Sequence, residues 1–190
     1  MRKYLLILLV LASCTKDEYL DFDTIRIPAG QSSNMFEITI NRVSDRIDGI
    51  IIATPSWYYT YEEIGGEDMN GLSKIDGLTD GKVHDSSARI AYKCVTDEYG
   101  EQHLMVYGYV WRNGVSPQEK ADQKHFLAEI IPDKAYRYSI LREGGMYKFN
   151  FDGVEWECLA GSNKMSWRCN PYIGGKYVLK HDWVVHIKRF

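Results

Sequence analysis

The chain has 190 residues, a formal net charge of −3 and 13% aromatic residues. This length is enough for one domain with a substantial core and too short for two domains of ordinary size. A weakly acidic chain without a basic cluster lacks the electrostatic footprint of a nucleic-acid-binding protein, so we expect no nucleic-acid partner. The many aromatic residues favour half-buried strand surfaces and flat faces on which sugar rings stack.

The first ten residues have the composition of an export signal. Arg2 and Lys3 form a positively charged start, and residues 4–10 (YLLILLV) are an apolar run. A run this short does not cross the roughly 30 Å hydrocarbon layer of a membrane as a stable helix. The pattern therefore predicts a signal that directs the chain across a membrane.

The apolar run leads into a cysteine at the position where such a signal is cut. Leu11, Ala12 and Ser13 precede Cys14, and this LASC tetrapeptide resembles the lipobox of bacterial lipoproteins. The resemblance implies that a diacylglyceryl group is attached to the Cys14 thiol and that residues 1–13 are removed. Acyl chains, at roughly 0.8 kcal/mol per buried CH₂ group, then hold the protein at a membrane. The alternative is an ordinary cleaved signal that contains a cysteine by chance.

A polar, mostly acidic segment follows the signal. Residues 14–24 have the composition of a solvated tether, and we assign residues 25–190 to one domain. Residues 16–18 (KDE) also resemble the short acidic signal that sends lipoproteins of Bacteroidota to the outer face of the outer membrane. The two resemblances imply a lipid-anchored protein of the bacterial outer membrane. For the second resemblance, the alternative is a generic linker.

Apolar and polar residues alternate along the domain with a period of two. This period predicts β-strands, and turns containing Gly, Asn or Asp separate them. Residues 117–125 (PQEKADQKH) are a candidate helical turn, which we expect to cap a loop. Many short strands with little helix predict an all-β fold, an antiparallel β-sandwich of the jelly-roll kind. The expected strands are residues 35–40, 50–54, 88–95, 103–111, 136–141, 146–151, 154–159 and 182–189.

Three further cysteines lie in the domain, at Cys94, Cys158 and Cys169. Export places them in an oxidising setting, but three is an odd number of thiols. Cys158 and Cys169 are close enough in sequence to lie in neighbouring strands, which makes them the better pair if a disulfide forms. Their spacing alone does not bring their Cα atoms within about 7 Å. The sequence has no CxxC pair, which argues against a structural zinc site.

Three segments carry a second resemblance. They are residues 71–93, which include Ser87-Ala88-Arg89, residues 104–114 (LMVYGYVWRNG) and residues 170–188, which include PYIGG and Lys180-His181-Asp182. Together they resemble a family of small, mostly uncharacterised β proteins of Bacteroidota and their phages. The chain departs from that pattern by having one histidine where a pair is expected, Ile173 in place of Phe, and Lys180 in place of Pro. The resemblance implies a β-sandwich fold and no particular activity.

Two His-Asp dipeptides are the first candidate site. His84 and Asp85, with Arg89 four residues later, and His181 with Asp182 would form an acid–base pair or ligate a cation if the two segments were neighbours in space. Arg89 would bind an acidic sugar. The alternative is structural: the histidines orient loops, and a carboxylate across the sheet fixes Arg89.

An aromatic cluster is the second candidate site. Trp57 and Tyr58 begin the run WYYTYEE, in which rings stand beside carboxylates, as a carbohydrate site requires. The alternative is that these rings belong to the core. Carboxylates downstream offer oxygen ligands for calcium, but their spacing is unlike an EF-hand, so we assign no metal site and no cofactor. These carboxylates are Glu62, Glu63, Glu67 and Asp68.

Three functions from different classes fit these features. A membrane-anchored module that binds a glycan, or one that assembles with another envelope protein, explains the anchor and the aromatic sandwich. A small glycan-degrading enzyme, hydrolase or lyase, would use His84, Tyr107 or His181 as base and Arg89 to stabilise charge. The 26 acidic residues do not single out the carboxylate pair of a glycosidase, so we rank the binding or assembly module above the enzyme.

Overall fold

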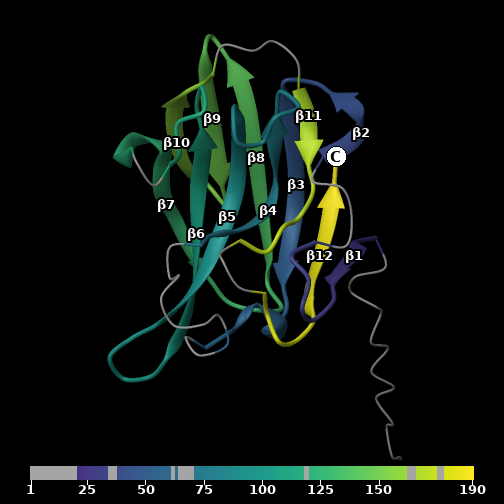
Figure 1. Cartoon of the computed structure of the whole chain (residues 1–190), viewed down its shortest axis with the longest axis vertical. Helices are drawn as coiled ribbons and strands as arrows, with labels where there is room; N and C mark the ends of the chain where they lie inside the picture. Colours follow the sequence, from purple (N-terminus) through teal and green to yellow (C-terminus); the bar gives the residue numbers. More distant parts are fainter. Residues whose placement is uncertain are drawn as a thin grey trace, which may run out of the picture.

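A computed structural model gives the structure of residues 21–33, 38–60, 63, 71–117, 120–161, 166–174 and 178–190. These residues form twelve β-strands and two short 3₁₀ helices, with no α-helix among them. The strands make two six-stranded antiparallel sheets (Figure 1). The expected fold class, an antiparallel β-sandwich of the jelly-roll kind, is confirmed.

The first sheet contains both ends of the described chain. Its last strand in the sequence, β12, lies between β1 and β3, so the N-terminal strand pairs with the C-terminal one (Figure 1). In spatial order its strands are β1 (Asp23–Ile27), β12 (Trp183–Arg189), β3 (Arg46–Ala53), β8 (Ala135–Glu143), β9 (Met146–Phe151) and β10 (Val154–Leu159).

The second sheet is built around the long β5–β6 hairpin. Strands β4 and β7 flank this hairpin, and the short β11 joins β4 to β2. In spatial order its strands are β2 (Ile38–Val43), β11 (Ser166–Cys169), β4 (Ser73–Thr79), β5 (Ser87–Thr96), β6 (Gln102–Trp111) and β7 (Lys124–Ile130).

All the strands that the alternation predicts are present, and four others were not predicted. These are β1, β4, β7 and β11. Strand β1 begins at Asp23, inside the segment assigned to the tether. The stretch at 117–125 contains the 3₁₀ helix η2 (Ala121–Gln123) and the start of β7 at Lys124. The signal and Cys14 lie outside the described residues.

The core between the sheets is rich in aromatic rings. Trp57, in the 3₁₀ helix η1 (Pro55–Trp57), is fully buried. Its ring centroid lies 4.2 Å from that of Tyr92 and 5.2 Å from that of Trp183, and its Nε1 donates to the Val184 carbonyl at 2.8 Å. The expectation that Trp57 offers a stacking surface to a ligand is therefore wrong, because the residue is 0% exposed inside the sandwich.

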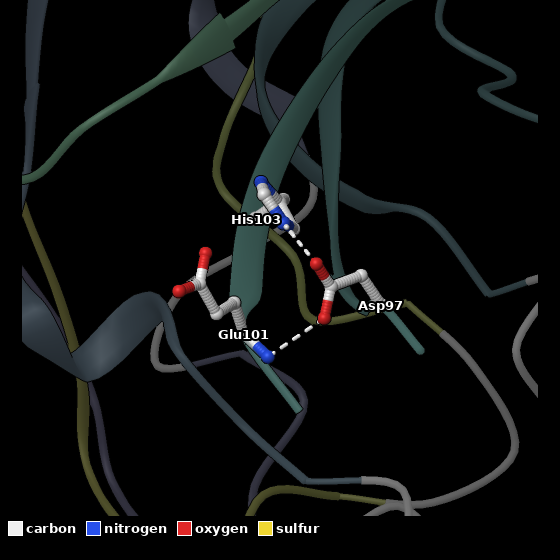
Figure 2. A group of neighbouring side chains, drawn as sticks. All are labelled: Asp97, Glu101 and His103. Atoms are coloured by element: carbon white, nitrogen blue, oxygen red, sulfur yellow. Dashed lines mark hydrogen bonds and ion pairs between the residues drawn. The ribbon is translucent and has the colours of Figure 1, made fainter. Parts of the chain in front are cut away.

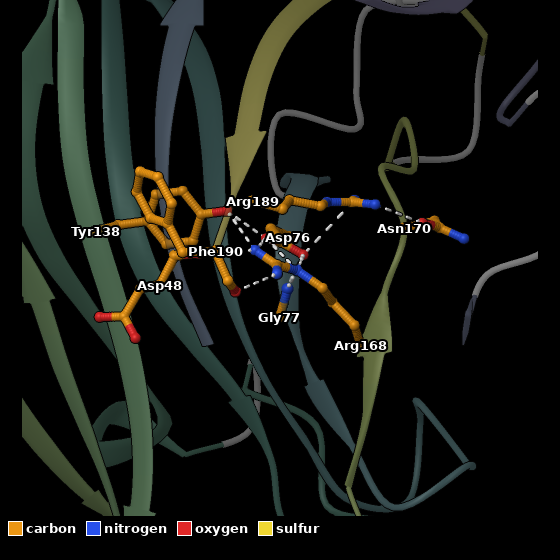
Figure 3. Close-up of polar contacts among 8 residues, drawn as sticks. All are labelled: Asp48, Asp76, Gly77, Tyr138, Arg168, Asn170, Arg189 and Phe190. Carbon is orange, nitrogen blue, oxygen red and sulfur yellow. Dashed lines mark hydrogen bonds and ion pairs between the residues drawn. The ribbon is translucent and has the colours of Figure 1, made fainter. Parts of the chain in front are cut away.

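One polar cluster links the two sheets within this core (Figure 3). Asp76 of β4, 0% exposed, accepts from Arg168 of β11, with Nη2 2.6 Å from Oδ2. Tyr138 of β8, in the opposite sheet, donates to Asp76, and Arg168 also donates to the Asp48 carbonyl of β3 at 3.1 Å. Burial lowers the pKa of Arg168, but the charge of Asp76 and its hydrogen bonds raise that pKa overall. The cluster therefore holds a buried ion pair of Asp76 and Arg168, and Arg189 of β12 adds a second, longer ion pair to Asp76 at 3.7 Å.

The three cysteines of the domain are buried, and none of them is in a disulfide. Cys158 lies in β10 of the first sheet and Cys169 in β11 of the second, so the pair favoured by sequence spacing does not form a disulfide.

The described residues include no helix that is long and apolar enough to span a membrane.

Candidate functional site

The outer face of the second sheet carries the candidate site. In β5, Ala88, Ile90 and Tyr92 point into the core, so Arg89, Ala91 and Lys93 lie on the opposite face. In β6 the core-facing residues include Leu104, Val106 and Val110. Three aromatic residues of β6 therefore follow one another on the outer face: Tyr107, Tyr109 and Trp111.

The strand register places cations on both sides of this aromatic row. Tyr109 pairs with Arg89 of β5 on one side and with Lys124 of β7 on the other. In the neighbouring position, Tyr107 pairs with Ala91 and with Phe126, whose ring meets that of Tyr107 edge-on at 5.9 Å. We call this surface the aromatic–basic face and define it by Lys74, Arg89, Lys93, Tyr107, Tyr109, Trp111, Lys124 and Phe126.

Two lysines lie over the rings of this face. Lys74 of β4 has its Nζ 5.1 Å from the ring centroid of Tyr109 and 6.0 Å from that of Tyr172. Lys93 has its Nζ 5.9 Å from the centroid of Tyr107. Ammonium groups at these distances are attracted by the ring faces, so the aromatic row holds positive charge beside it.

Burial sets the protonation of the tyrosines and of one lysine. It raises the pKa of Tyr107 and of Tyr109; for Tyr109, a hydrogen bond with Trp111 and the charge of Arg89 oppose the rise in part. It lowers the pKa of Lys93, and the charge of Lys124 lowers it further. Both phenols therefore stay protonated near neutral pH, and the two lysines repel each other.

Arg89 lies flat against the sheet. Its paired neighbour on β4 is Gly77, and a Cβ at that position would come within 2.7 Å of the Arg89 side chain. Glycine thus leaves the space in which the arginine lies. Its guanidinium donates to the Ser87 hydroxyl at 3.2 Å and to the Val83 carbonyl at 3.1 Å. Arg89 is only 2% exposed, and both of these acceptors are uncharged.

A hollow of about 480 Å³ adjoins the end of the aromatic row. It is lined by the loop between β4 and β5, which includes His84 and Asp85, and by Ile38 of β2. The exposed His84 ring lies 5.1 Å from the ring of Trp111, and the Asp85 carbonyl accepts from Gly114. The first candidate group, His84, Asp85 and Arg89, is therefore brought to one region beside the aromatic row.

The comparisons with known proteins give the fold a context. No protein-family model matches the chain, and no curated protein is similar to it. Several solved structures share its architecture. A β-1,3-1,4-glucanase (lichenase) from a mouse hindgut metagenome has a TM-score of 0.51 and 10% identity, covering 89% of this chain and 81% of its own. This likeness is one of fold.

Two further solved structures hold a sugar. An alginate lyase in complex with dimannuronate has a TM-score of 0.50 and 9% identity, covering 89% of this chain and 73% of its own. A transglycosylase, Crh5, in complex with NAG has a TM-score of 0.50 and 11% identity, covering 87% of this chain and 70% of its own.

The second His-Asp dipeptide lies apart from the aromatic–basic face and has partners of its own. His181 bonds to the Glu63 carboxylate at 3.0 Å and to the Ser56 carbonyl at 2.9 Å. Asp182 forms an ion pair with Arg26 of β1, and the Ala29 amide donates to it at 2.9 Å. The hydrogen bond from the Ala29 amide, and next the one from Arg26, lower the pKa of Asp182. These contacts fix the N-terminal strand to the sandwich.

The expected combinations with this second dipeptide do not form. Within the described ranges, no hydrogen bond or ion pair joins His84 or Arg89 to His181 or Asp182. A buried network of His84, Arg89 and Asp182 is also absent there, because His84 is exposed and Asp182 pairs with Arg26. Tyr58 is half-buried and packs against the core.

A cluster of Asp97, Glu101 and His103 lies at the turn between β5 and β6 (Figure 2). Asp97 accepts from the backbone amides of Tyr99 and Glu101 at 2.9 and 2.8 Å. His103 lies between two carboxylates, 2.7 Å from Glu129 and 3.4 Å from Asp97. These bonds close the turn and join it to β7, which accounts for the cluster as a brace of the hairpin.

The calcium alternative falls mostly outside the described residues. Glu62, Glu67 and Asp68 lie there, and Glu63 accepts from the Thr60 amide at 2.9 Å as well as bonding to His181. Glu63 therefore has structural partners.

A larger hollow, of about 630 Å³, lies on the outer face of the first sheet. Its charges are balanced, because three cations and three acids line it. Arg46 pairs with Asp48 at 2.7 Å, and Lys148 pairs with Glu143 at 2.9 Å. Despite its greater size, this hollow has no row of rings like that of β6, so we place the candidate site on the second sheet.

Several residues of the aromatic–basic face were not candidates from sequence. Tyr107 was named only as one possible base, and Tyr109, Trp111, Lys93 and Lys124 were not named. Alternation in residues 103–111 gives the common face of Tyr107, Tyr109 and Trp111. The signal that identifies them together is the pairing register of β5, β6 and β7, which sequence does not supply.

Proposed function

We propose that the protein is an exported lipoprotein that binds a glycan on the aromatic–basic face. The observation that carries the proposal is the row of Tyr107, Tyr109 and Trp111 along β6, with cations on the strands at either side. Sugar C–H faces stack on such rings, and sugar hydroxyls bond to the polar groups around them.

The burial of the three rings suits this use. Tyr109 is 4% exposed and packs with Ala91 and Leu72, which holds the row in place. Tyr107 and Trp111 are half-buried, so part of each ring is open to a ligand. Preorganised rings of this kind lose little conformational entropy on binding. The shared fold with carbohydrate-active sandwich proteins is consistent with the proposal.

A glycan-degrading enzyme is the second candidate, and the tyrosines argue for ranking it lower. A tyrosine that acts as a base must lose its proton. Burial raises the pKa of both Tyr107 and Tyr109 instead. Of the three bases expected from sequence, the exposed His84 beside Trp111 is the one that remains beside this face. Enzyme activity would appear as shortening of the glycan during the binding assay, and His84→Ala would abolish it.

The experiment is a glycan-array screen followed by calorimetry on the full-length chain in mild detergent. Tyr107→Ala and Trp111→Ala should each weaken binding about tenfold, which corresponds to about 1.4 kcal/mol. Tyr99→Ala is the matched control, because Tyr99 is an exposed tyrosine on the hairpin turn, 83% exposed. If Tyr107→Ala, Trp111→Ala and Tyr99→Ala all bound the glycan with the same affinity as the unmodified chain, the site would not lie on this face.

Membrane attachment is tested separately. We propose lipidation at Cys14, on the resemblance of LASC to a lipobox. Cys14→Ala should release the protein from the membrane fraction or leave it as an uncut precursor. Unchanged processing together with unchanged attachment would rule out the lipid anchor and leave the glycan proposal standing. Assembly with another envelope protein is the remaining alternative, and glycan binding that depends on Tyr107 would separate the two.

A further inference from the structure

Three cations of the aromatic–basic face, Arg89, Lys93 and Lys124, have no carboxylate partner among the described residues. The acid nearest to them along β7 is Glu129, and it is already bonded to His103 at 2.7 Å. Positive charge therefore accumulates on this face of a chain whose overall net charge is −3.

Arg89 makes the imbalance sharper because it is buried. Its guanidinium has the Ser87 hydroxyl and the Val83 carbonyl as partners, and neither carries a charge. Burying a cation without a counter-ion is unfavourable. A negative group bound on this face would reduce that cost, whereas a neutral sugar would leave it unchanged.

Two lysines stand on either side of one ring. Along β6, Lys93 lies opposite Met105, two positions before Tyr107, and Lys124 lies opposite Tyr109, two positions after it. Lys93 reaches back over the Tyr107 ring, with its Nζ 5.9 Å from the centroid. Lys93 is partly buried, and the positive charge of Lys124 further disfavours its ammonium form. An anion between the two lysines would relieve their mutual repulsion.

We propose that the ligand of this face is an anionic glycan, with a carboxylate or sulfate group held by Lys93 and Lys124 while its sugar ring stacks on Tyr107. Arg89, which is paired with Tyr109 on the same face of β5, adds its positive charge beside this group. The inference rests on the proposed function, and it deepens that function by naming the class of glycan. It assigns no role to the hollow on the first sheet, whose charges are balanced.

The test compares two polymers that differ only in charge. Polygalacturonate and its carboxyl-reduced, neutral derivative are each titrated into the full-length chain in detergent at low and high salt. We expect the neutral polymer to bind at least about tenfold more weakly, and high salt to weaken polygalacturonate binding alone. A sulfated galactan is the third arm, which distinguishes sulfate from carboxylate as the preferred anion.

The matched variants separate this site from general attraction between charges. Lys93→Gln with Lys124→Gln should lower affinity for the anionic polymer about tenfold, to near that of the neutral polymer. Lys148→Gln, on the outer face of the first sheet, is the control and should leave affinity unchanged. The double variant should keep its melting temperature, because neither lysine has an ion pair to lose.

Three results would overturn the inference, and they have different meanings. Equal binding of charged and neutral polymers would remove the anionic preference but keep the glycan-binding function. Equal losses in the Lys148 control and in the double variant would show unspecific charge attraction. Binding of no polymer in any arm, together with no hit in the glycan screen, would remove both the inference and the proposed function.

Discussion

Two buried arginines of the second sheet differ in whether the protein supplies a negatively charged partner. Arg168 points into the core, where Asp76 accepts from it at 2.6 Å and the Tyr138 hydroxyl lies 3.1 Å away (Figure 3). Arg89 lies on the outer face and has uncharged acceptors. The comparison teaches that burial of an arginine does not indicate function by itself. The presence of a counter-ion distinguishes the two cases. A buried arginine with a carboxylate partner inside the protein is part of a structural ion pair, whereas a buried arginine without one points to a bound anionic ligand.

The first way to break this comparison is to remove the internal counter-ion. Asp76→Asn keeps the shape of the side chain but leaves the charge of Arg168 buried and unpaired. We expect the free energy of unfolding, measured in urea, to fall by about 3–5 kcal/mol. The double variant Asp76→Leu with Arg168→Met should recover part of the loss, because it removes the unpaired Arg168 charge and leaves only that of Arg189, whose Nη2 lies 3.7 Å from Asp76.

An exposed ion pair serves as the control for that measurement. Arg46 and Asp48 lie 2.7 Å apart on the surface of the first sheet. Arg46→Gln should lower the free energy of unfolding by less than about 1 kcal/mol, because water screens such pairs. Equal losses in Asp76→Asn and Arg46→Gln would contradict the structural role of the buried pair.

The second change removes the arginine that lacks a counter-ion. Arg89→Met retains bulk on β5 and gives up two hydrogen bonds to neutral groups. The free energy of unfolding should therefore fall by only about 1 kcal/mol. Affinity for an anionic glycan should fall at least about tenfold, measured by calorimetry. A large loss of stability with unchanged affinity would reassign Arg89 to the structural class.

The third and smallest effect concerns His103, an ionisable side chain that is paired with carboxylates at the surface. Bonds to Glu129 and then to Asp97 raise the pKa of His103 above its ordinary value of about 6.5. A raised folded-state pKa means that protonated His103 stabilises the hairpin fully below about pH 6.5, and that this contribution is lost as pH rises through the folded-state pKa.

NMR titration of the His103 ring checks this prediction. The pKa should lie above that of an unfolded histidine peptide, and Glu129→Gln should lower it. The melting temperature of His103→Gln, measured as a function of pH, should differ from that of the unmodified chain only in losing the change near neutral pH. A titration midpoint at or below about 6.5 would contradict the bracing role.

Sequence predicts the fold of this protein well where strands alternate cleanly. Strands β5, β6, β8 and β9 have one apolar face, and all were expected. Strand β4 was missed for a physical reason: its pairing with β5 shifts at a bulge between Lys74 and Asp76. The bulge turns both Ile75 and Asp76 inward, which breaks the period of two.

The candidate site was predictable only in part. The loop at His84 and the strand at Arg89 were identified because polar residues there have no obvious turn role. Trp57 was misassigned because an aromatic ring in sequence looks the same whether it faces solvent or core. Lys93 and Lys124 are 31 positions apart in the chain, and only the register of three strands places them on either side of Tyr107, which no local pattern encodes.

The three buried thiols of the domain have a consequence for how the opening of this fold can be followed. Burial raises the pKa of Cys158 to about 11 and that of Cys94 above its ordinary range, so neither forms a reactive thiolate while its strand is closed. A thiol reagent therefore reacts only when a strand separates. Cys158 reports on edge strand β10, Cys94 on central strand β5, and Cys169 on β11. The unmodified chain thus carries its own chemical reporters of local unfolding, at least one in each sheet.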